Sequence, residues 1–67
     1  MAVARVTTII ASSTKSWQDA AEKGFKRAAK TLRGITGLRV LEQTASANKG
    51  KITEYRIRMK VTFVLED

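Results

Sequence analysis

The residues best suited to chemistry lie near the C-terminal end, where basic side chains occupy every second position. Arg56, Arg58 and Lys60 alternate with apolar residues, so in a strand they share one face. A row of guanidinium and ammonium groups is suited to binding anions such as phosphates. Glu54 and Glu42 are the carboxylates that would partly neutralise this row within the sheet. A ligand-binding role and a solvated, partly neutralised face both stay open.

Catalytic chemistry has little to work with in this chain. Its 67 residues include no cysteine and no histidine, which excludes disulfides, zinc sites of the usual kind, and imidazole bases. A chain of this length forms one small unit and has no room for a buried cleft. We therefore expect a single domain over residues 1–67, with no enzymatic activity and no catalytic residues.

The net charge of +7 raises the question of a polyanionic partner, because 13 Lys and Arg stand against 6 Asp and Glu. The positive residues are spread along the chain, and a solvated surface, a small anionic ligand and nucleic acid are all compatible with them. The aromatic residues fall on predicted core faces and leave no platform on which bases stack; they are Trp17, Phe25, Tyr55 and Phe63. We expect no nucleic-acid partner.

A strand and a helix are predicted in the first half. Residues 3–10 are rich in β-branched types and indicate a strand, and the small polar cluster 11–14 indicates a turn. Ser16 with Asp19 resembles a capping box that opens a helix over Trp17–Leu32, and Gly34 marks its end. The inner stripe of this helix is small, which allows close approach of a sheet, with bulk from Trp17, Phe25 and Leu32.

Two strands are predicted in the second half, 38–44 and 52–65, joined by a hairpin loop at 45–50. The last strand has one apolar face formed by Tyr55, Ile57, Met59, Val61, Phe63 and Leu65. Its fourteen residues would span about 46 Å, which a 67-residue monomer does not cover. The strand therefore bends around the helix or pairs with another subunit, and both options favour an oligomer.

The βαββ order, the length and several local sequences resemble the dodecin family. The resemblance covers essentially the whole chain and is carried by Arg5-Val6 to Ile10, Ser12-Ser13, Ser16-Trp17, Ala20-Ala21, Arg27-Ala28, Lys30-Thr31-Leu32, Arg39-Val40-Leu41-Glu42-Gln43, Lys51-Ile52, Tyr55-Arg56-Ile57 and Val61-Thr62-Phe63. It implies an α+β fold in which a three-stranded antiparallel sheet curls around one helix. It also implies a hollow homododecamer that stores flavin in pairs, stacked between tryptophans of neighbouring subunits and hydrogen-bonded by a glutamine.

The chain departs from this pattern at two ligand positions. Gly37, followed by Leu38, matches the stacking tryptophan, and Arg56 matches the glutamine, while Glu42 and Gln43 match the acidic and amide positions near the ligand. These five residues are the predicted cofactor-binding set, and the chain is similar to the subgroup that lacks the tryptophan. An arginine donates hydrogen bonds but accepts none, so it cannot reproduce the amide's pattern.

Two functions follow from the resemblance. The first is storage of riboflavin, of its phosphate FMN, or of a CoA-like nucleotide at sites between subunits. The alternative is a structural or calcium-binding dodecamer that has lost flavin; calcium would need carboxylates such as Glu42 or Glu54 from several subunits, because one chain offers no dense cluster of oxygen ligands. No basic segment precedes an apolar run at the start and no stretch approaches a membrane span, so we expect a soluble cytoplasmic protein whose partners are itself and a small molecule.

Overall fold

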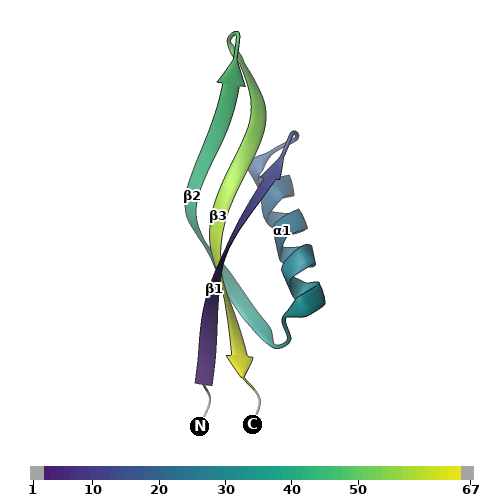
Figure 1. Ribbon diagram of the computed structural model, residues 1–67, viewed down its shortest axis with the longest axis vertical. Helices are drawn as coiled ribbons and strands as arrows, with labels where there is room; N and C mark the ends of the chain where they lie inside the picture. Colours follow the sequence, from purple (N-terminus) through teal and green to yellow (C-terminus); the bar gives the residue numbers. More distant parts are fainter. Residues whose placement is uncertain (1–2, 66–67) are drawn as a thin grey trace.

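The computed structural model describes residues 3–65, so the ends of the predicted 1–67 domain, residues 1–2 and 66–67, lie outside it. The chain forms β1 (Val3–Ser13), α1 (Trp17–Thr31), β2 (Ile35–Asn48) and β3 (Lys51–Leu65), as Figure 1 shows. The strands form one antiparallel sheet in the order β1-β3-β2. The predicted βαββ fold with a three-stranded antiparallel sheet and one helix is confirmed.

The helix packs on one face of the sheet, against β1 and β3. The hairpin of β2 and β3 runs past the start of α1, which leaves the subunit elongated at 53 × 19 × 13 Å (Figure 1). The core joins Ala20 of the helix to Ile57 and Met59 of β3, all at most 2% exposed. Val61 and Phe63 are also buried, so the predicted apolar face of the last strand is confirmed along its middle.

Close approach of the helix to the sheet depends on Gly24. A Cβ atom at this position would lie 2.8 Å from the Cβ of Ala11 and 3.0 Å from the Cε of Met59, which is nearer than side-chain carbons pack. The predicted shallow stripe is therefore present. Phe25 was predicted to supply bulk to the core, and this is wrong: it is 37% exposed, because it follows Gly24 and is rotated about 100° around the helix axis from the contact.

The helix start is fixed by three side chains. Ser16 is the N-cap, and its hydroxyl accepts a hydrogen bond from the backbone N–H of Asp19 at 3.0 Å. The Asp19 carboxylate does not complete the predicted box; it accepts from the Ser13 hydroxyl at 2.5 Å and pairs with Lys23 at 3.1 Å. These two hydrogen bonds, that of Ser13 first, lower the pKa of Asp19. The start of α1 is thereby tied to the end of β1.

The helix ends one residue earlier than predicted. Leu32 is the C-cap, with an extended backbone, and its N–H donates to the carbonyl oxygen of Ala28 at 2.9 Å. Gly34 then turns the chain with a φ of 74°. A Cβ there would lie 2.8 Å from the carbonyl oxygen of Val64, so the position requires glycine on two counts. Gly34 shapes the entry into β2, and the helix itself stops before it.

The hairpin differs from the predicted loop over 45–50. β2 begins at Ile35 and continues to Asn48, and only Lys49 and Gly50 form the turn, with φ values of 52° and 78°. Two successive positive φ values are typical of the tight turn whose twist matches an antiparallel pair. Ala45, Ser46 and Ala47 are weak strand formers, but each faces a residue of β3 in the sheet, and this pairing overrides their propensity.

Trp17 lies where the helix meets the hairpin. It packs against the core and is partly buried. Its ring stands edge-on to Tyr55 with ring centroids 4.9 Å apart, and its Nε1 donates to the carbonyl oxygen of Thr44 at 2.8 Å. The predicted core role of Trp17 is therefore observed, with one additional function: the indole N–H bonds β2 to the helix.

Candidate functional site

The candidate site lies on the face of the sheet opposite the helix, which we call the open face. Arg56, Arg58 and Lys60 are exposed there, since the residues between them turn toward α1 and are buried. Antiparallel neighbours in register share a face, so the pairing of the strands defines the rest of the surface. Read from β2 through β3 to β1, its rows are Gly37–Thr62–Val6, Arg39–Lys60–Thr8, Glu42–Arg58–Ile10 and Thr44–Arg56–Ser12.

Two of the three basic side chains in the predicted row have carboxylate partners. Arg56 lies 2.6 Å from Glu54, and Arg58 lies 3.8 Å from Glu42 on the neighbouring strand. The predicted partial neutralisation is thus observed for both arginines. These pairs are exposed, so each contributes at most about 1 kcal/mol to stability. Their main effect is local, because they reduce the positive charge at this end of the open face.

The five predicted cofactor-binding residues divide between the two faces of the sheet. Gly37, Glu42 and Arg56 lie on the open face, in the rows given above. Leu38 and Gln43 face Val61 and Ile57 in register and therefore lie on the helix side. Adjacent residues of a strand point to opposite faces, and the β-bulge between Val40 and Glu42 places Glu42, rather than Gln43, on the same face as Gly37. Their role in binding stays a prediction.

Gly37 leaves free space on the open face. A Cβ atom at this position would have no neighbouring atom within 4 Å, and the backbone there needs no positive φ. A methyl group is therefore accommodated there without a clash within the subunit. Next to it on the helix side, Leu38 lines a groove of about 310 Å³ together with Ala21, Glu22, Phe25 and Lys26.

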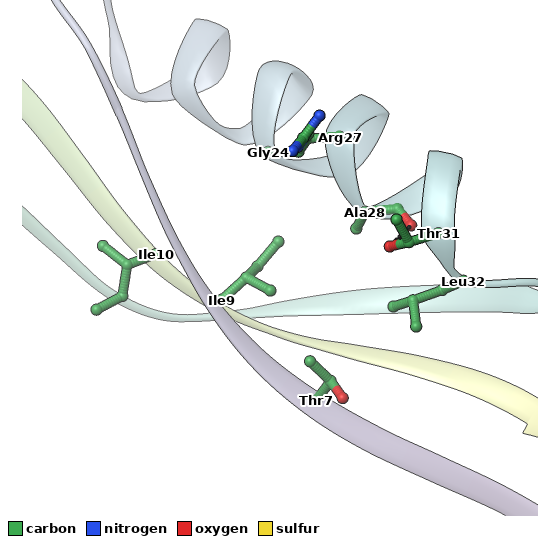
Figure 2. Close-up of a pocket in the computed structure, with 8 residues that line it drawn as sticks. All are labelled: Thr7, Ile9, Ile10, Gly24, Arg27, Ala28, Thr31 and Leu32. Atoms are coloured by element: carbon green, nitrogen blue, oxygen red, sulfur yellow. Dashed lines mark hydrogen bonds between the residues drawn. The ribbon is translucent and has the colours of Figure 1, made fainter.

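A larger cavity of about 400 Å³ lies between β1 and α1, away from the predicted residues (Figure 2). Ile9 of β1 and Ala28 of α1 are among its walls, and its full lining is Thr7, Ile9, Ile10, Gly24, Arg27, Ala28, Thr31 and Leu32. The small residues Gly24 and Ala28 are part of this lining, and the sequence pattern indicated close packing at these positions but no cavity.

Two further observations concern metal binding and membrane crossing. Among residues 3–65, no three acidic side chains converge in a way that could hold a metal ion within one subunit. In the same part of the chain, the helix lacks the length and apolar character needed to cross a membrane.

Comparison with known proteins gives a consistent family. The family model described as Dodecin matches residues 3–66. The calcium dodecin of Mycobacterium tuberculosis (strain ATCC 25618 / H37Rv) is 41% identical over 64 residues, which cover 94% of this chain and 89% of that protein.

Solved structures agree with the sequence relatives. Dodecin from Streptomyces davaonensis has a TM-score of 0.92 at 32% identity, with 98% of this chain and 97% of that chain covered. The crystal structure of the M. tuberculosis calcium dodecin, described as a calcium-chelating antigen with a novel calcium-binding site, has a TM-score of 0.82 at 37% identity, covering 96% and 91% of the two chains.

Proposed function

The chain belongs to the dodecin family, as its sequence pattern predicted. From this premise we propose that it is a cytoplasmic binding and storage protein without catalytic activity. Its ligand is an anionic flavin-type cofactor, which it holds between copies of itself. The observation that carries the proposal is the open face. Arg39 of β2 and Lys60 of β3 lie in the row next to the free space at Gly37, and that combination suits a flat ring with a negatively charged substituent.

Self-assembly into a homododecamer is the second part of the proposal. The elongated subunit leaves large apolar side chains in contact with water on both sides of the sheet. Val6 and Ile10 on the open face are 54% and 65% exposed, and Leu38 and Val40 on the helix side are 42% and 43% exposed. Large apolar side chains left exposed in this way are characteristic of protein interfaces. Further copies of the chain would cover it and complete sites between subunits.

The ligand follows from the two departures from the family pattern. Gly37 removes a stacking ring, which would lower flavin affinity by roughly 0.5–1.5 kcal/mol per contact beyond the effect of area. Arg56 replaces an amide with a donor that favours negative charge. We therefore rank FMN or a CoA-like nucleotide above riboflavin, which carries no phosphate.

Native mass spectrometry of the freshly purified protein tests both parts of the proposal, because one spectrum reports subunit number and the mass of any retained ligand. We expect a twelve-subunit species that carries flavin-sized or nucleotide-sized adducts. A monomer or dimer would contradict the assembly. A twelve-subunit species that stays empty and gains no mass when incubated with FMN would contradict flavin storage.

Gly37→Trp sharpens the test of the site. If Gly37 borders the ligand, the new ring should strengthen flavin binding several-fold to about tenfold for each stacking contact, as measured by quenching of flavin fluorescence. Gly37→Ala is the matched control, since it fills the same free space without a ring. Equal affinities of the two variants would place the ligand elsewhere.

Calcium binding is a second candidate, favoured by the similarity to a protein named calcium dodecin. Glu42 and Glu54 would have to converge from several subunits, and each already pairs with an arginine. Calcium would therefore compete with Arg58 and Arg56 for these carboxylates. If calcium is the ligand, it should raise the thermal midpoint of the protein, and Glu42→Gln should abolish that rise while Glu22→Gln preserves it. No rise with calcium in the unmodified protein would eliminate this candidate.

A further inference from the structure

We propose that Arg39, Lys60 and Thr8 form a phosphate subsite on the open face, so that the stored ligand is a phosphate ester. The inference rests on the proposed function and deepens it, because it names the charged group that the ligand carries. Of the predicted basic row Arg56, Arg58 and Lys60, it retains only Lys60 as a phosphate ligand, and it adds Arg39 and Thr8 from the neighbouring strands.

The first support is the register of β2 and β3. Arg39 and Lys60 face each other directly across the two strands, and both side chains are exposed on the same face. Like charges directly opposite each other destabilise a sheet. Within residues 3–65, neither side chain has a carboxylate partner. A bound dianion would relieve this repulsion by accepting hydrogen bonds from both groups at once.

The second support is the contrast with the neighbouring arginines. Arg58 and Arg56 follow Lys60 on the same face, and each is occupied by a glutamate. The row Arg39–Lys60–Thr8 is therefore the part of this basic surface where two positive charges meet and neither makes an ion pair with a described carboxylate. A phosphate drawn to the open face encounters its strongest attraction there.

The third support is the set of donors and its distance from the free space. Thr8 lies beside Lys60 on the β1 side, so guanidinium, ammonium and hydroxyl donors come from three adjacent strands. A guanidinium binds two phosphate oxygens in a fixed geometry, and the ammonium adds a point charge. The row with Gly37 lies one step along the sheet, about 7 Å away. A ring over Gly37 with its phosphate between Arg39 and Lys60 fits this spacing.

The test compares FMN and riboflavin, which differ only in the phosphate, by fluorescence titration at fixed ionic strength. The unmodified protein should bind FMN about tenfold more tightly. The double variant Arg39→Gln/Lys60→Gln should bind both flavins equally, with riboflavin affinity unchanged. Lys49→Gln/Lys51→Gln is the matched control, because it removes the same charge at the hairpin end and should keep the preference for FMN. If the unmodified protein bound FMN and riboflavin equally well, the phosphate subsite would be contradicted and the proposal of flavin storage would stand.

A second probe keeps the inference testable if neither flavin binds. Inorganic phosphate, compared with chloride at the same ionic strength and protein concentration, should raise the thermal midpoint of the unmodified protein and of the Lys49/Lys51 control. The rise should be lost in Arg39→Gln/Lys60→Gln. In that case the flavin proposal fails while the phosphate subsite stands. The absence of any rise, or a rise that persists in the double variant, would overturn the subsite itself.

Discussion

The two faces of β3 differ in almost every physical respect although they share one backbone. On the helix side, Ile57, Met59 and Val61 are at most 2% exposed and pack against α1. On the open face, the alternating residues Arg56, Arg58 and Lys60 are exposed. Arg56 and Arg58 each pair with a glutamate, and Lys60 pairs with no carboxylate among residues 3–65. The first face stabilises the subunit by removing apolar surface from water. The second contributes little stability, so its residues can be substituted to suit a ligand without loss of the fold.

This difference separates what a substitution does to folding from what it does to binding. A change on the helix side should act on stability whatever the ligand is. A change on the open face should leave the fold intact and alter affinity, charge pairing or salt dependence. Substitutions at four positions test that separation, and the effect expected on stability falls from the first to the last.

Ile57→Asp should abolish the folded assembly. The substitution removes a buried apolar side chain and places an unpaired carboxylate in the core, at a cost of about 3–5 kcal/mol or more, which is a large part of the stability of a small domain. Circular dichroism and size-exclusion chromatography report the loss. Thr8→Asp is the control, because it adds the same charge at an exposed position facing Lys60. An Ile57→Asp protein that assembles normally would contradict the burial of this face.

Gly24→Ala should destabilise the protein by up to about 2 kcal/mol. Overpacking typically costs about 1–3 kcal/mol, and the better helix propensity of alanine returns up to about 1 kcal/mol. Gly37→Ala is the matched control, because its new methyl group meets no atom. Urea denaturation of both variants at one protein concentration measures the difference. If both variants were equally stable, α1 would lie further from the sheet than the close contact at Gly24 requires.

Lys60→Glu should stabilise the protein slightly, by about 0.5 kcal/mol, because it replaces a like-charge pair opposite Arg39 with an attractive one. The gain should shrink as salt is added, since both side chains are exposed. Lys51→Glu, which faces Asn48, is the control and should show no such gain. Thermal midpoints at low and high salt provide the measurement. A loss of stability would mean that Arg39 and Lys60 do not repel each other.

The smallest expected effect is a dependence of stability on pH that comes from Asp19 at the start of α1. Its folded-state pKa lies below the ordinary value of 3.8 because Ser13 and Lys23 donate hydrogen bonds to the carboxylate. The unfolded chain therefore binds the proton first, so this stabilisation is complete above about pH 5 and is lost as the pH falls through the folded-state pKa. Thermal midpoints measured between about pH 6 and pH 2 should decline less steeply for Asp19→Asn than for the unmodified protein. Parallel curves would contradict the pKa shift.

The helix side of β3 and the basic row on its open face were predictable from the sequence, and the part of the open face that β2 contributes was not. Alternation over 52–65 predicted the burial of Ile57, Met59, Val61 and Phe63, because a half-buried strand has a period of two. It failed at the end of the strand, where Leu65 is 41% exposed. The same rule fails on β2, where a bulge at Leu41 brings Arg39 and Glu42 to one face although their numbers differ in parity. A bulge depends on pairing with β3 and has no strong local signal. The opposition of Arg39 to Lys60 therefore required the structure.

The contact of Trp17 with Tyr55 and Thr44 has a practical consequence. It is the chain's one tryptophan, and it joins the start of α1 to both strands of the hairpin. The near-ultraviolet emission of the protein therefore comes chiefly from a single indole at the junction between helix and sheet. A red shift of that emission during dilution or heating would time the separation of these elements without any label.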